Sequence, residues 1–188
     1  MSTGFRDRWY QLSKQFAQQE AICHTSRRVT YGQLAAQANM YARRLTDLDL
    51  IHTCIPVLVD SPIDHIAALL GILLSGNYYY SVHPDRAPTI NQILKSVGAQ
   101  ALIATADLVD PELLPDSQWL IQPDTLQPVR SYQATQVIEP TTAFCLFTTS
   151  GTTGEPKQVI HSHQSVLTDT DRQIADNQVG PADRIDLL

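Results

Sequence analysis

A run of hydroxyl, glycine and lysine side chains, 148–157, follows directly after an apolar stretch. Its two glycines, Gly151 and Gly154, can adopt positive φ and leave no side chain between the backbone N–H groups and a ligand. The threonine and serine hydroxyls add short donors, and Lys157 adds a mobile positive charge. Each charge-assisted hydrogen bond contributes roughly 1.5–3 kcal/mol. The run therefore predicts a loop that binds a polyphosphate.

The spacing within this run differs from that of the commonest phosphate-binding loop. In that loop a lysine directly follows the second glycine and a helix begins at once. Here Glu155 and Pro156 separate Gly154 from Lys157, Gln158 follows, and the next residues predict a strand. A Gly/Thr hairpin that joins two strands without a ligand is the alternative interpretation. The length of the run and its Pro-Lys ending favour a ligand.

The histidines and serine near this loop allow two other kinds of site. His161 and His163 could point a pair of imidazoles at a metal ion, but no acidic or thiol side chain is spaced to complete the site, so we expect none. Ser150 and His163 could form a nucleophile and its base, but the G-x-S-x-G turn that exposes such a serine is missing. Ser150 is therefore interpreted as a phosphate donor.

The composition indicates one domain, or one domain with an appendage, with enough apolar residues for a core, 43% of 188. The net charge of -6 gives no basic face for nucleic acid or for an anionic membrane. Three cysteines are far apart in the chain, which predicts reduced, buried thiols. With no apolar signal segment at the start and no stretch long enough to span a bilayer, a cytoplasmic location is expected.

Strands and helices are expected to alternate along the first part of the chain, 1–106. Thr30 is a plausible N-cap for the second helix, and Gly98 should close the fourth. The expected helices are 5–19, 30–49, 62–76 and 89–97, and the expected strands are 21–25, 54–59, 78–82 and 101–104, with a turn at 26–28. This alternation predicts an α/β fold with a mostly parallel sheet flanked by helices.

The second part of the chain divides into two segments. Prolines concentrate in 107–140, which is interpreted as an insertion or linker with one possible strand at 119–121. The phosphate-loop segment, 141–188, should contain strands at 143–148 and 158–161 and a helix at 162–176. Residues 185–188 begin what is expected to be another buried strand, so we interpret the chain as the N-terminal portion of something longer or as a truncated product.

The stretch Thr149–Lys157 resembles the signature loop of the adenylate-forming, or AMP-binding, superfamily, which includes acyl-CoA synthetases and the adenylation domains of nonribosomal peptide synthetases. Val29–Asn39 is similar to a helix of that family, and 70–105 is similar to its next segment. His163 stands where the family has a histidine, and 183–185 resembles the strand that follows. The resemblance spans essentially the whole chain, as a partial N-terminal AMP-binding domain.

The resemblance implies a two-step reaction, in which ATP with Mg²⁺ converts a carboxylic or amino acid to an acyl-adenylate. The acyl group then passes to coenzyme A or to a carrier-protein thiol. It also implies that one set of residues binds the ATP phosphates: Thr149, Ser150, Gly151, Thr152, Thr153, Gly154 and Lys157. His163 would help to position the phosphates or the acyl group.

This chain departs from the family pattern in three respects, one of which, at Tyr78–His83, lies in a variable structural strand. Gln158 stands where the family usually has glycine, which would crowd the backbone or change the mobility of the loop. The family's later elements, including the Mg²⁺-binding acid and the catalytic lysine, lie beyond Leu188, so we expect no adenylation by this chain alone. The alternative is a truncated, non-catalytic module for nucleotide binding or protein interaction. An independent nucleoside triphosphatase is disfavoured by the spacing of Lys157.

Overall fold

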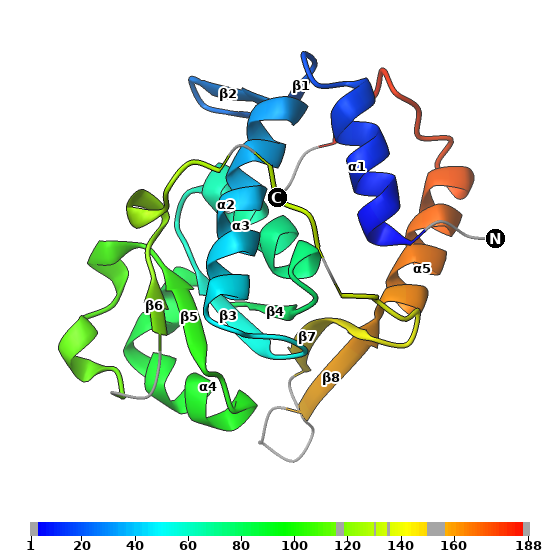
Figure 1. Cartoon of the computed structure of the whole chain (residues 1–188). Helices are drawn as coiled ribbons and strands as arrows, with labels where there is room; N and C mark the ends of the chain where they lie inside the picture. The colour runs from blue at the N-terminus through cyan, green and yellow to red at the C-terminus, as the bar shows by residue number, and fades with distance from the viewer. Residues whose placement is uncertain (1–3, 116–118, 130, 135, 150–156, 186–188) are drawn as a thin grey trace.

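The computed structural model describes residues 4–115, 119–129, 131–134, 136–149 and 157–185. Among these residues a six-stranded sheet with the order β6-β5-β3-β4-β7-β8 runs through the middle of the molecule (Figure 1). Its strands are β3 (Cys54–Leu58), β4 (Tyr78–Ser81), β5 (Ala101–Ala104), β6 (Trp119–Ile121), β7 (Ala143–Thr149) and β8 (Lys157–Ser162). Each pair of neighbours from β6 to β7 is parallel, and β8 alone runs antiparallel, against β7.

Helices cover both faces of this sheet. The helices are α1 (Phe5–Gln15), α2 (Tyr31–Asp47), α3 (Pro62–Leu74), α4 (Ile90–Val97) and α5 (His163–Asp176). Ile55 and Val57 of β3 pack in one core cluster with residues of α2 and α3, while Leu58 packs in a second cluster with residues of α4. All of β3 is buried, as expected of a strand that is covered on both faces. The predicted α/β class with a mostly parallel, helix-flanked sheet is confirmed.

Local sequence signals set several of these boundaries. Thr30 caps α2 as predicted: its Oγ1 accepts from Gln33 N at 3.2 Å, and Gln33 Oε1 accepts from Thr30 N at 2.9 Å. Ser61 caps α3, which begins with Pro62. Gly98 adopts φ 61° at the end of α4, a left-handed conformation that suits glycine.

A small two-stranded sheet lies outside the main one. It consists of β1 (Glu20–His24) and β2 (Arg27–Thr30), which pair antiparallel. The expected turn at 26–28 was placed too late, because Thr25 already takes the left-handed conformation and β2 begins at Arg27. Cys23 of β1 is exposed, whereas Cys54 and Cys145 are buried. The prediction that all three thiols are buried was wrong for Cys23, because β1 and β2 are half exposed at the surface.

The proline-rich segment 107–140 lies along one edge of the main sheet. Besides β6 it contains the short 3-10 helices Pro111–Leu113 and Pro123–Thr125, and others lie at Pro84–Thr89 and Ala106–Leu108. Its strand β6 pairs parallel with β5, and Tyr132 joins the core cluster that α2 and α3 form. The strand expected at 119–121 is therefore present. Within the described ranges, no helix is both long and apolar enough to cross a membrane.

Helices α1 and α5 lie side by side at the β8 end of the molecule (Figure 1). Arg8 of α1 donates through Nη2 to Asp171 Oδ2 of α5 at 2.8 Å. At the start of both helices, the rings of Phe5, Phe144 and His163 form a cluster with centroids 4.9–6.1 Å apart. The beginning of α5 is thus fixed to α1 and to β7 by an aromatic core.

Candidate functional site

The hairpin of β7 and β8 brings the two ends of the predicted phosphate loop together. Thr149 is the last residue of β7, Lys157 is the first of β8, and the two are paired directly across the ladder. Residues directly opposite one another in an antiparallel pair point their side chains to the same face. Thr149 and Lys157 are both exposed, so a hydroxyl and an ammonium group are available side by side at the end of the hairpin.

The other predicted phosphate-binding residues lie between these two. Ser150, Gly151, Thr152, Thr153 and Gly154 are outside the described residues, and their role remains a prediction. The segment after Lys157 is a strand, as expected, and not the helix that follows the commonest phosphate loop. The strands on either side of the run therefore agree with the prediction, made from the spacing of Gly154 and Lys157, that this is not the commonest phosphate loop.

His163 is the first residue of α5, and it lies in the core with 3% of its surface exposed. Its ring centroid is 4.9 Å from that of Phe144, and its Nε2 has no hydrogen-bond partner among the residues that the structure describes. Burial, together with the positive charge of Arg6, lowers the pKa of His163 to about 4 from its ordinary value of 6.5. The imidazole is therefore neutral at pH 7.

Lys157 is the first residue of β8, and His163 follows its last residue, Ser162. Five residues of extended chain lie between them, and the six steps from one to the other correspond to roughly 20 Å at about 3.3 Å per residue. The structure therefore does not bring His163 to the end of the hairpin where Thr149 and Lys157 meet. The expectation that His163 helps to position the phosphates or the acyl group came from the family resemblance, and it stays a prediction.

The buried imidazole predicts a specific loss of stability in acid. The unfolded chain takes up a proton at His163 near pH 6.5 and the folded chain only near pH 4, so this contribution is present above pH 6.5 and lost as the pH falls towards 4. The full contribution of the His163 pKa difference to the free energy of unfolding is about 3 kcal/mol. We expect His163→Phe, which keeps a ring in the aromatic cluster, to reduce the loss between pH 7 and pH 4.5 by about 2–3 kcal/mol. Urea unfolding at a series of pH values checks this; identical pH profiles for the two proteins would contradict it.

Sequence reasoning missed the residues that anchor the surroundings of the hairpin. Arg6 of α1 donates through Nη1 to Gln136 O at 2.5 Å and through Nη2 to Leu74 O at 2.8 Å. The hydroxyl of Tyr80 on β4 lies 3.2 Å from Thr148 Oγ1, a contact that the sequence does not signal. Gln158 departs from the family pattern, but nothing in the sequence indicates that its side chain donates to the carbonyl oxygen of Ser96 on α4.

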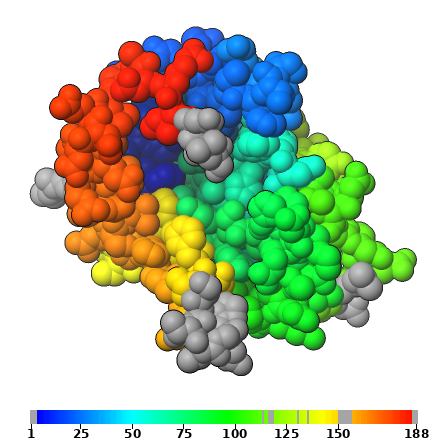
Figure 2. Space-filling model, turned by 180° about the vertical axis from the view of Figure 1, so that it is seen from behind, coloured from blue at the N-terminus to red at the C-terminus, as the bar shows by residue number. Residues whose placement is uncertain are grey.

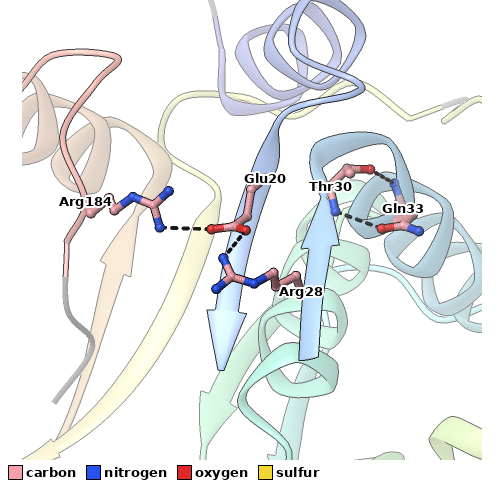
Figure 3. Close-up of polar contacts among 5 residues, drawn as sticks. All are labelled: Glu20, Arg28, Thr30, Gln33 and Arg184. Atoms are coloured by element: carbon pink, nitrogen blue, oxygen red, sulfur yellow. Dashed lines mark hydrogen bonds and ion pairs between the residues drawn. The ribbon is translucent and has the colours of Figure 1, made fainter. Parts of the chain in front are cut away.

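The described residues also contain a surface groove away from the hairpin. It has a volume of about 990 Å³ and is lined by α1, β1 and the segment 181–185. That segment crosses the N-terminal elements (Figure 2), and Arg184 Nη1 donates to Glu20 Oε1 at 3.0 Å (Figure 3). Arg28 donates to the other carboxylate oxygen at 2.6 Å, and these contacts hold the pKa of Glu20 below its usual value. The groove contains neither Thr149 nor Lys157.

No group of three or more His, Cys, Asp or Glu side chains is arranged as a metal site in the part of the chain that the structure describes.

The fold and the hairpin together define the class of protein. The family model for AMP-binding enzymes matches residues 9–187, and the chain belongs to this family. Surfactin synthase subunit 1 of Bacillus subtilis is 29% identical over 171 residues, covering 84% of this chain and 5% of that protein. The D-alanine–D-alanyl carrier protein ligase of Lactiplantibacillus plantarum is 33% identical over 158 residues, covering 79% of this chain and 30% of that protein.

Solved structures show the same fold. The nonribosomal peptide synthetase FmoA3, in its α-methyl-L-serine-AMP-bound form, superposes with a TM-score of 0.87 at 24% identity, over 98% of this chain and 20% of that chain. The N-terminal subdomain of Klebsiella oxytoca NpsA, in complex with 3-hydroxyanthranilyl-AMSN, superposes with a TM-score of 0.73 at 23% identity, over 87% and 42%. This chain thus has the fold of the N-terminal subdomain of adenylate-forming enzymes, and it spans less than half the length of each of these relatives.

Proposed function

We propose that this chain is the N-terminal portion of an ATP-dependent ligase that activates a carboxylic or amino acid as an acyl-adenylate. The observation that carries the proposal is the pairing of Thr149 with Lys157 at the end of the β7–β8 hairpin, inside the segment that the AMP-binding family model matches. A carboxylate would attack the α-phosphorus of ATP, and pyrophosphate would leave. Negative charge then builds on the departing phosphates.

The proposed role of the hairpin end is to stabilise that charge. The hydroxyls of Thr149, Ser150, Thr152 and Thr153, the backbone at Gly151 and Gly154, and the ammonium group of Lys157 would donate to the β- and γ-phosphates. Donors that are already in place need no reorganisation as the charge develops, which makes them effective in catalysis. Mg²⁺ would arrive with the nucleotide, bound to its phosphates.

We assign His163 a positioning role rather than a contact with the phosphates. It is buried among Phe5 and Phe144 at the far end of β8. By packing there, a neutral imidazole would fix the start of α5 and the base of the hairpin.

The remainder of an adenylate-forming domain is proposed to complete the site. The hairpin carries exposed apolar side chains on both faces, with Phe147 49%, Val159 39% and Ile160 55% exposed. Exposed apolar groups gathered on one element mark a surface that another polypeptide segment covers.

The same exposed apolar surface favours the second candidate function, a non-catalytic module that binds nucleotide or pairs with another protein. Acceptors of the transferred acyl group would be coenzyme A or a carrier-protein thiol in the cytoplasm, with the carrier protein favoured by the D-alanine ligase relative.

The test is a titration of the purified chain with Mg-ATP by calorimetry, run beside ATP–pyrophosphate exchange with a panel of carboxylates. We expect Lys157→Ala to weaken ATP binding about 10-fold or more, because one charge-assisted contact of roughly 1.5–3 kcal/mol is lost. Lys14→Ala is the matched control, since Lys14 is an exposed lysine on α1, remote from the hairpin.

Three results would decide the matter. ATP binding that is weakened by Lys157→Ala and not by Lys14→Ala, without exchange, supports a phosphate site that needs its remainder. Exchange by the chain alone, abolished in Lys157→Ala, would show that the fragment is complete. No ATP binding, or equal binding by all three proteins, would contradict the phosphate-binding role and leave the interaction module.

A further inference from the structure

Gln158 ties the end of the hairpin to helix α4. Its Nε2 donates to the carbonyl oxygen of Ser96 at 3.2 Å and lies 3.4 Å from Ser96 Oγ. Ser96 is in the last turn of α4, where carbonyl groups lack a partner further along the helix. The N–H groups of Gly98 and Ala99 satisfy the carbonyls of Lys95 and Leu94. The Gln158 amide thus caps the next carbonyl of the same helix end.

A second contact holds the opposite strand at the same level. Gln158 is paired across the ladder with Thr148, and Thr148 Oγ1 lies 3.2 Å from the hydroxyl of Tyr80 on β4. Both strands of the hairpin are therefore attached to the body of the domain at one cross-strand pair, or rung: Gln158 contacts α4, and Thr148 contacts β4.

This rung is adjacent to the pair that the proposed function uses. Thr149 and Lys157 follow directly on the loop side of Thr148 and Gln158. A side chain that anchors one rung restricts the movement of the next, because the ladder hydrogen bonds and the covalent backbone connect them. A glycine at 158, as the family resemblance leads one to expect, would leave the β8 side of this rung without an anchor.

We propose that Gln158 is a positioning residue, which couples α4 to the hairpin and holds Lys157 opposite Thr149 in the place where phosphate would bind. The consequence for phosphate binding rests on the proposed function; the coupling itself does not. An exposed hydrogen bond of this kind contributes roughly 0.5–1.5 kcal/mol. The effect should accordingly be local, seen at the hairpin rather than in the overall stability of the domain.

Gln158→Met tests the coupling, because methionine has nearly the same length and no hydrogen-bond donor. In native-state hydrogen exchange we expect the amides of 157–161 to exchange about 2- to 10-fold faster in this variant, the factor that corresponds to one lost hydrogen bond. Gln164→Met is the matched control, since Gln164 is exposed on α5 just beyond the hairpin. Its exchange at 157–161 should equal that of the wild-type chain.

Mg-ATP affinity of the same variants separates this inference from the proposed function. If Gln158→Met exchanges faster and its ATP affinity falls by a similar factor, the positioning role is supported. If it exchanges faster but binds ATP as tightly as the wild-type chain, the positioning role is overturned. Unchanged exchange in Gln158→Met overturns the coupling, whether or not ATP binds. Faster exchange in a chain that binds no ATP supports the coupling and contradicts the proposed function.

Discussion

Replacing Asn77 by alanine should lower the free energy of unfolding by about 2–5 kcal/mol, because two buried backbone groups would lose their partner. Asn77 has no exposed surface. Its Oδ1 accepts from Thr53 N at 3.0 Å, and its Nδ2 donates to Leu50 O and to Ser75 Oγ, each at 2.9 Å. One side chain therefore connects the segment before β3 to the segment before β4.

Equilibrium unfolding in urea, followed by circular dichroism, measures this change. Asn177→Ala is the matched control, since Asn177 is an exposed asparagine at the end of α5 whose Nδ2 also donates to a backbone carbonyl, that of Gln173. We expect a change within about 0.5 kcal/mol for the control, as is usual for surface substitutions. If Asn77→Ala were no more costly than Asn177→Ala, the buried network would not be needed for stability.

Gly71→Ala should also destabilise the protein, although alanine favours helices by about 1 kcal/mol over glycine. Gly71 lies in α3 where it crosses α2, and an added Cβ would be 2.5 Å from Tyr41 Cβ and 2.6 Å from Ala38 O. Ala38 O belongs to the backbone and cannot rotate away. The two helices must therefore move apart, and overpacking of this kind costs about 1–3 kcal/mol.

The thermal midpoint measures this effect. For a protein of this size, a loss of 1 kcal/mol lowers the midpoint by about 2–4 °C. Gly180→Ala is the control, because among the described residues only Asp183 Oδ2 lies within 4 Å of a Cβ added there, at 3.8 Å. A midpoint for Gly71→Ala at or above that of the control would mean that α2 and α3 accommodate the methyl group, and that the close approach is not required.

Much of the fold was predictable because its signals are local. The continuous apolar run of β3 predicts a strand covered on both faces, Thr30 with Gln33 predicts a capped helix start, and Gly98 predicts a helix end. Each of these depends on residues only a few positions apart. The order of elements and the mostly parallel sheet follow from such signals together with the rules for connections between strands.

The rest depends on contacts between residues that are distant in the chain. The exposure of Cys23 depends on β1 and β2 lying outside the main sheet. Gln158 donates a hydrogen bond to Ser96, 62 positions away in the sequence, and Arg6 donates one to Gln136, 130 positions away. The separation of His163 from Lys157 was hidden for the opposite reason: the two are close in sequence, and only the extended β8 sets them apart. Composition and motifs predicted the two strands that flank the loop, but could not say what anchors that end of the hairpin.

The position of β8 at the end of the sheet has a consequence for how the chain behaves at high concentration. Among the described strands, β8 has β7 on one side and none on the other, and its central residues Val159 and Ile160 are exposed and β-branched. A free strand edge of this composition is a template for another strand, in the way that aggregates and fibrils grow. Lys157 at its start is the kind of charged residue that opposes such growth. Lys157 would thus have two roles: it would bind phosphate, and it would keep the free edge of β8 from pairing with another chain.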